Sequence, residues 1–116
     1  MIARETANFN REEGRTVFAA LLEEYEEIDG VFAHNDEMIL GAIEAAKAAD
    51  RAGDILFVGF DAIEDAVAAV ESGDLLATIA QQPAEMGRLG VEAAVDYLNG
   101  TEIPESVPVD LALITK

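Results

Sequence analysis

The chain has 116 residues, of which 24 are Asp or Glu and only 7 are Lys or Arg, so its formal net charge is −17. Such a surface lacks the clustered cations that neutralise phosphates, which excludes a nucleic-acid-binding protein. The same negative charge would be repelled by an anionic membrane. No run of about 18 apolar residues predicts membrane insertion, and no signal peptide is visible at the first residues. Hydrophobic residues make up 51% of the chain, enough for the core of one domain or of a piece of a larger one.

The first half of the chain alternates predicted helices and strands. Residues 1–8 form a short, weakly extended start. Apolar residues at three- and four-residue spacing then predict a helix over 11–27, with Asn10 as its N-cap. Residues 31–33 form a short buried strand, and a helix follows over 37–49.

The second half continues the alternation. The run at 55–60 is the strongest strand, and because it is apolar throughout, we expect both of its faces to be covered. A helix over 63–71 ends at Ser72-Gly73, and a strand over 76–80 leads to a helix from Pro83 to about Asn99. A last strand covers 109–114. This order predicts an α/β fold with a doubly wound, mostly parallel sheet and right-handed crossovers.

Polar side chains follow three of the predicted strands. Asn35 and Asp36 come after the strand at 31–33, Asp61 ends the strand at 55–60, and Gln81 follows the strand at 76–80. Ligands of such sheets bind at the carboxyl ends of the strands, and amides with carboxylates suit a ligand with many hydroxyls. The alternative is structural, because Asn35 or Asp36 is also a natural N-cap for the helix that follows.

Other chemistries find less support in the sequence. His34 with Asp36 and Glu37 is read as a polar turn rather than a metal site. The chain has no Gly-x-Ser-x-Gly turn, no glycine-rich phosphate loop, and no cysteine. No pair of carboxylates has surroundings that would separate their pKa values. We therefore expect no catalytic residue, no metal, no cofactor and no enzymatic activity.

Three segments together resemble a known family. Phe32-Ala33-His34-Asn35-Asp36-Glu37-Met38, Val58-Gly59-Phe60-Asp61 and Thr78-Ile79-Ala80-Gln81-Gln82-Pro83 match, in order and spacing, landmarks of type I periplasmic sugar-binding proteins. The likeness covers essentially all 116 residues, but it corresponds only to the C-terminal part of that family's chain and is closest to its ribose binders. It implies the sugar-binding component of an ABC transport system, periplasmic or extracytoplasmic, with ribose or a related monosaccharide as ligand and a membrane permease as partner.

The resemblance also implies a set of sugar-binding residues. Phe9 matches the aromatic residue that stacks on the sugar, and Asn35, Asp61 and Gln81 match the family's polar ligands. An aromatic ring suits the apolar face of a sugar. The alternative for Phe9 is a hydrophobic staple against the helix at 11–27.

The resemblance further implies an incomplete lobe. Residues 1–81 match most of the C-terminal sugar-binding lobe, 82–103 a helix that packs on the N-terminal lobe, and 104–116 a return loop and final strand. The N-terminal lobe is missing, as are the first strand and helix of the matching lobe. We therefore expect a fragment with half a binding site. Its uncovered helix predicts self-association or binding to a separate lobe.

Two alternatives use related folds. The first is an effector-binding core fragment of a lactose-repressor-type transcription regulator, which would need a DNA-binding headpiece and sits poorly with the net charge of −17. The second is a receiver-type signalling domain, which the length, the acidity and Asp61 would fit. The acidic pair and the lysine that mark such domains are absent from this sequence.

Overall fold

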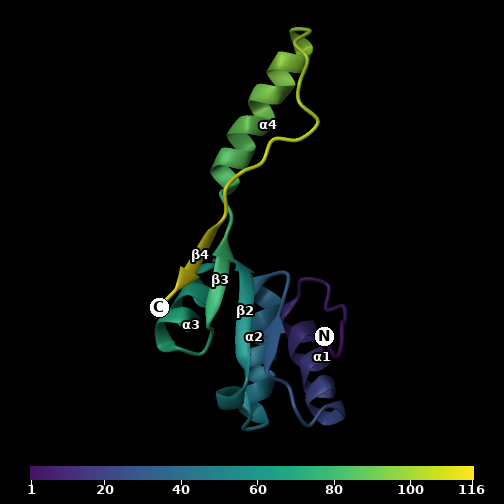
Figure 1. Ribbon diagram of the computed structural model, residues 1–116, viewed down its shortest axis with the longest axis vertical. Helices are drawn as coiled ribbons and strands as arrows, with labels where there is room; N and C mark the ends of the chain where they lie inside the picture. Colours follow the sequence, from purple (N-terminus) through teal and green to yellow (C-terminus); the bar gives the residue numbers. More distant parts are fainter. The chain divides into compact units, whose positions relative to one another are not determined.

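The computed structural model describes all 116 residues and shows an α/β chain (Figure 1). The chain divides into two compact units, residues 1–80 with 113–116, and residues 81–112. Its elements are α1 (Arg11–Glu24), β1 (Gly30–Phe32), α2 (Asp36–Ala48), a 3-10 turn (Ala52–Asp54), β2 (Leu56–Asp61), α3 (Glu64–Ser72), β3 (Ala77–Ala80), α4 (Pro83–Leu98) and β4 (Ala112–Thr115).

The four strands form one sheet in the order β1-β2-β3-β4. β1 pairs in parallel with β2, and β2 pairs in parallel with β3. In Figure 1, β4 is antiparallel to β3, so the sheet is mixed but mostly parallel. The predicted α/β class is confirmed.

The helices of the first unit share one face of the sheet. The connections β1-α2-β2 and β2-α3-β3 step in the same direction along the sheet, and right-handed crossovers then place α2 and α3 on the same side. α1 joins them there, because the Phe18 ring makes an edge-on contact with the Phe57 ring of β2, with centroids 5.9 Å apart. Phe18, Ile39, Phe57 and Val70 belong to one buried core.

The prediction that the strand at 55–60 is covered on both faces is wrong. Leu56 of β2 is 59% exposed, and Phe32 of neighbouring β1 is 53% exposed. The reason is that α1, α2 and α3 all lie on one face of the sheet. No helix covers these side chains on the opposite face. The apolar run therefore predicted the strand correctly, but not which of its faces are covered.

The helix caps follow local chemistry. The side chain of Asn10 accepts the backbone N–H of Glu13, which confirms the N-cap predicted for α1, and the side chain of Asn35 accepts that of Met38, so Asn35 rather than Asp36 caps α2. Gly73 ends α3 with a φ of 92°, the left-handed C-cap that glycine adopts without a steric penalty.

α1 ends at Glu24 rather than at residue 27, where a distant side chain binds carbonyl groups in the last turn of the helix and just after it. The Arg51 guanidinium donates hydrogen bonds to the carbonyl oxygens of Leu22, Tyr25 and Glu26, at 3.1, 3.1 and 2.7 Å. Tyr25 is extended, with a φ of −118°. The guanidinium thus supplies hydrogen-bond donors to carbonyl groups that have no N–H partner within the helix.

The second unit consists of α4 and the loop that follows it. No residue of α4 is buried, and its apolar side chains Met86, Val91, Val95 and Leu98 are 48 to 83% exposed. Arg88 pairs with Glu85 and Glu92 along the same helix. The Gln82 side-chain amide donates to the Asp110 carbonyl at 3.0 Å, which joins the start of the helix to the returning loop. No helix in the structure is long and apolar enough to span a membrane.

Candidate functional site

The candidate site lies at the carboxyl edge of the parallel strands in the first unit. β1, β2 and β3 run in the same direction, so the loops that leave them and the N-termini of α2 and α3 gather at one edge. Phe9, just before α1, reaches the same edge because its carbonyl bonds to Asn35. The edge therefore collects residues from segments far apart in the sequence.

Phe9 and Asn35 lie together there. Asn35 accepts the Met38 N–H through Oδ1 at 3.0 Å, and its Nδ2 donates to the Phe9 carbonyl at 3.4 Å. The two readings of Asn35, a cap and a ligand-binding amide, are thus compatible, because the cap uses the oxygen and leaves one N–H for a ligand.

The Phe9 ring projects from a strained turn. Asn8 and Phe9 have φ values of 46° and 56°, a region that residues other than glycine seldom adopt. The Asn8 amide donates to a Glu13 carboxylate oxygen at 2.6 Å, which helps to hold the turn. Phe9 is 66% exposed, so the staple alternative is wrong. A bulky aromatic side chain held out to solvent in a costly backbone conformation is a feature typical of binding sites.

Asp61 sits in a second strained turn. Asp61 and Ala62 have φ values of 116° and 54°. The Ala62 N–H donates to the Thr78 hydroxyl oxygen at 3.2 Å, and the Ile63 N–H donates to Asp36 Oδ2 at 2.9 Å. The Thr78 hydroxyl in turn donates to Asp36 Oδ1 at 2.7 Å. This network fixes the half-buried Asp61 at the carboxyl end of β2.

Asp36 is a positioning residue that the sequence did not single out as such. It is fully buried, and burial raises the pKa of its carboxyl group, with the nearby Asp61 carboxylate acting in the same direction. Hydrogen bonds from Thr78 and from the Ile63 backbone oppose that rise in pKa by stabilising the ionised form. Gly59 makes room for it, because a Cβ atom there would lie 2.2 Å from Asp36 Oδ1.

Arg11 ties the start of α1 to α2 and α3. Its Nε donates to Glu37 at 2.8 Å, and one of its terminal nitrogens reaches Asp65 at 2.9 Å. These two carboxylates raise the pKa of Arg11. The sequence held one signal for this role of Arg11. A positive charge in the first turn of a helix is disfavoured by the helix macrodipole unless carboxylates pair with it.

Gln81 belongs to the other unit, directly after β3 ends at Ala80. The structure thus brings three of the four candidate residues to one edge of the first unit: Phe9, Asn35 and Asp61. An exposed aromatic ring, an amide N–H and a carboxylate can together stack on and hydrogen-bond a small polyhydroxylated molecule. Arg11 is engaged by Glu37 and Asp65.

Comparison with known proteins agrees with this chemistry. A family model described as "Periplasmic binding protein domain" matches residues 2–102. The chain is 42% identical over its full length to the ribose import binding protein of Bacillus subtilis, of which it covers 37%. It is also 42% identical over its full length to the ribose import binding protein of Escherichia coli, of which it covers 39%.

Solved structures of similar proteins share the fold. An ABC transporter solute-binding protein from Bacillus halodurans with bound myo-inositol is 35% identical, with a TM-score of 0.86; the match covers 99% of this chain and 40% of that one. A periplasmic solute-binding protein from Actinobacillus succinogenes with bound D-allose is 34% identical, with a TM-score of 0.84, over 94% of this chain and 38% of that one. The chain spans about two fifths of these relatives, and it belongs to the periplasmic binding protein family.

Proposed function

We propose that this chain forms one side of a monosaccharide-binding site, with ribose or a related sugar as ligand. The observation that carries the proposal is the exposed ring of Phe9, a residue whose backbone carbonyl accepts a hydrogen bond from the Asn35 amide at the carboxyl edge of the sheet. The relatives support the choice of ligand class, because those with full-length matches include ribose import binding proteins. The relatives bind sugars for transport, and the proposed role here is likewise binding rather than catalysis.

Each residue has a distinct part in the proposed site. The Phe9 ring stacks on the apolar face of the sugar, where C–H groups replace water. Asn35 donates its remaining N–H to a hydroxyl oxygen, and the Asp61 carboxylate accepts hydroxyl protons in charge-assisted hydrogen bonds. Such a site needs no metal and no cofactor.

In the longer protein we propose that residues 1–81 supply one lobe of a two-lobed binder. Residues 82–103 then pack on a second lobe that this chain does not contain, and residues 104–116 return to the first. The exposed apolar side chains of α4 support that packing, and without the second lobe they favour self-association. The complete binder would act outside the cytoplasm and deliver its sugar to a membrane permease. The comparisons give no support to the transcription-regulator alternative.

The test is an NMR titration of the chain with D-ribose. With half of the contacts and no closure of a second lobe, we expect a millimolar dissociation constant, equivalent to about −4 kcal/mol. Backbone shifts should concentrate at Phe9, Asn35 and Asp61. Phe9→Ala should abolish them.

Leu56→Ala is the matched control, because Leu56 is exposed to a similar degree but begins β2, at the opposite end of the strands from the site. It should leave the titration unchanged. Shifts that arise only outside the carboxyl edge of the sheet, or that survive Phe9→Ala, would contradict the proposed site. Micromolar or tighter binding would contradict the half-site argument.

A further inference from the structure

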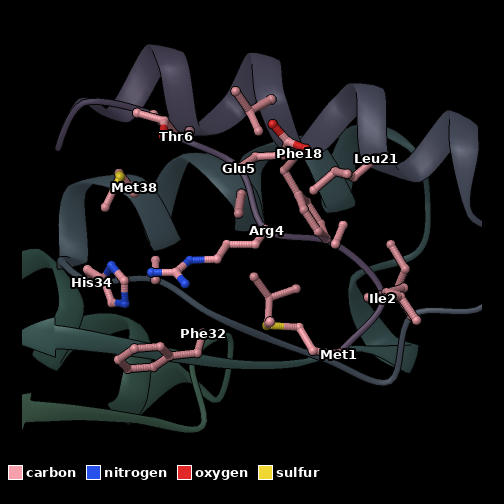
Figure 2. Close-up of a pocket in the computed structure, with 18 of the residues that line it drawn as sticks. Met1, Ile2, Arg4, Glu5, Thr6, Phe18, Leu21, Phe32, His34 and Met38 are labelled. Carbon is pink, nitrogen blue, oxygen red and sulfur yellow. The ribbon is translucent and has the colours of Figure 1, made fainter.

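The Asp36 side chain lies in the interior of the first unit and not in the large cavity beside it. Figure 2 shows His34 and Met38, on either side of Asp36 in the chain, among the residues that line a cavity of about 960 Å³. Asp36 lines no part of this cavity and is fully buried. Its carboxylate therefore serves contacts within the protein, and one of these contacts leads to β3.

That contact is with Thr78 of β3. In the parallel register of β2 and β3, Thr78 lies opposite Gly59. Because Gly59 has no side chain, Asp36 fits above it, and the Thr78 hydroxyl donates to Asp36 Oδ1 at 2.7 Å. Thr78 is fully buried as well, so the bond is shielded from water and is stronger for it.

The same hydroxyl also binds the turn between β2 and α3. Its oxygen accepts the Ala62 N–H at 3.2 Å, and the other Asp36 oxygen accepts the Ile63 N–H at 2.9 Å. Ile63 is the N-cap of α3 and offers no capping side chain, so the acceptors come from α2 and β3 instead. A hydroxyl donates and accepts at once, which a valine of the same shape cannot do. We call Asp36, Thr78 and the backbone of Ala62 and Ile63 the turn clamp.

The turn clamp holds a strained backbone. Asp61 and Ala62 have φ values of 116° and 54°, and such conformations persist in residues other than glycine only where the surroundings impose them. The clamp bonds to the residues directly after Asp61. Because Asn35 directly precedes Asp36, the same bonds also set the distance between Asn35 and Asp61, which are two of the proposed sugar ligands.

We propose that Thr78 is a positioning residue of the sugar site, which acts through the turn clamp to hold the Asp61 carboxylate where it accepts sugar hydroxyls. The inference rests on the proposed function, because it gives Thr78 a part in that same site. Thr78 is fully buried and so makes no contact with the sugar. A substitution there changes sugar affinity by moving Asp61.

The first experiment needs no sugar. The three-bond coupling between amide and α protons depends on φ, and NMR measures it for Asp61 and Ala62. Thr78→Val keeps the side-chain shape and removes the hydroxyl, so both couplings should change, whereas Thr78→Ser keeps the hydroxyl and should preserve them. Asn8 and Phe9 also have positive φ values, but another bond holds their turn, so they are the internal control and should not change.

The second experiment is the ribose titration. Thr78→Val should raise the dissociation constant about tenfold, equivalent to about 1.4 kcal/mol, and Thr78→Ser should raise it less than about threefold. In a chain that already carries Asp61→Asn, Thr78→Val should add less than about threefold, because the affinity that it controls is already lost. A purely structural role of Thr78 would instead give the same added effect with and without Asp61.

A folding control accompanies both experiments. Urea unfolding shows whether each variant is folded under the conditions of the titration. If Thr78→Val does not fold, Thr78→Ser compared with Thr78→Ala gives the same information, because both lack the methyl group and they differ only in the hydroxyl.

The outcomes separate this inference from the proposed function. If the unmodified chain does not bind ribose, the proposed function fails, and the couplings of Asp61 and Ala62 still decide whether Thr78 holds the turn. If ribose binds, the role of Thr78 is overturned by unchanged couplings or an unchanged dissociation constant in Thr78→Val. It is also overturned by an equal loss of affinity in Thr78→Ser, or by a full tenfold effect in the Asp61→Asn chain.

Discussion

Gly41 of α2 lies against the backbone of α1, and replacing it tests how the site is held. A Cβ atom at this position would lie 2.0 Å from the Arg11 carbonyl oxygen and 2.8 Å from the Arg15 nitrogen. Ordinary van der Waals contact begins near 3.4 Å, so the two helices must separate by about 1.4 Å. Both obstacles are backbone atoms, which cannot rotate away.

The magnitude for Gly41→Ala follows from two opposing effects. Alanine favours a helix interior over glycine by about 1 kcal/mol. Overpacking against a fixed backbone costs about 3 kcal/mol, at the upper end of its usual range. We therefore expect a net loss of about 2 kcal/mol in the free energy of unfolding. Because Phe9 is two residues before Arg11, the same shift should move its ring and weaken ribose binding.

The assay is urea unfolding followed by far-ultraviolet circular dichroism, since the chain has no tryptophan. Gly87→Ala in α4 is the matched control, because a Cβ atom there meets nothing within 4 Å. It should be neutral or stabilising. The reasoning is refuted if Gly41→Ala unfolds at the same or a higher urea concentration than the unmodified chain with the same slope.

Three further predictions concern the caps and charges. Asn35→Ala should cost about 1 kcal/mol in urea unfolding, whereas Asn35→Asp keeps the cap and should stay near the unmodified stability. Asp36→Asn should cost about 1 to 3 kcal/mol, because the amide cannot accept from both Thr78 and Ile63. The pKa of Asp36 is raised above 3.8 in the folded chain, so the unmodified chain loses stability as the pH rises from 3.8 through the folded-state pKa. The stability lost in Asp36→Asn, relative to the unmodified chain, should therefore be largest at acid pH and smaller at pH 7. A loss that grows toward pH 7 in the same unfolding assay would contradict this prediction. Added NaCl should raise the unfolding midpoint by screening the net charge of −17, and an unchanged midpoint would show that repulsion is negligible.

The sequence by itself determined the features that depend on short range. Asn10 and Asn35 each cap a helix through a hydrogen bond to the residue three positions on, a spacing visible in the chain. Apolar periodicity located each helix and strand to within a few residues. Polar residues at the ends of parallel strands placed Asn35 and Asp61 at one edge, and their part in sugar binding stays a prediction.

Tertiary structure alone decided the contacts between distant segments. Asp36 and Thr78 are 42 residues apart, and only the parallel pairing of β2 with β3 places Thr78 beside the buried carboxylate. The direction of the crossovers decided that one face of the sheet remains open, which an apolar strand sequence does not reveal. The free edge of β1 has the same origin, because an unpaired edge depends on which strand lies next to it in space, and residue order does not specify that neighbour.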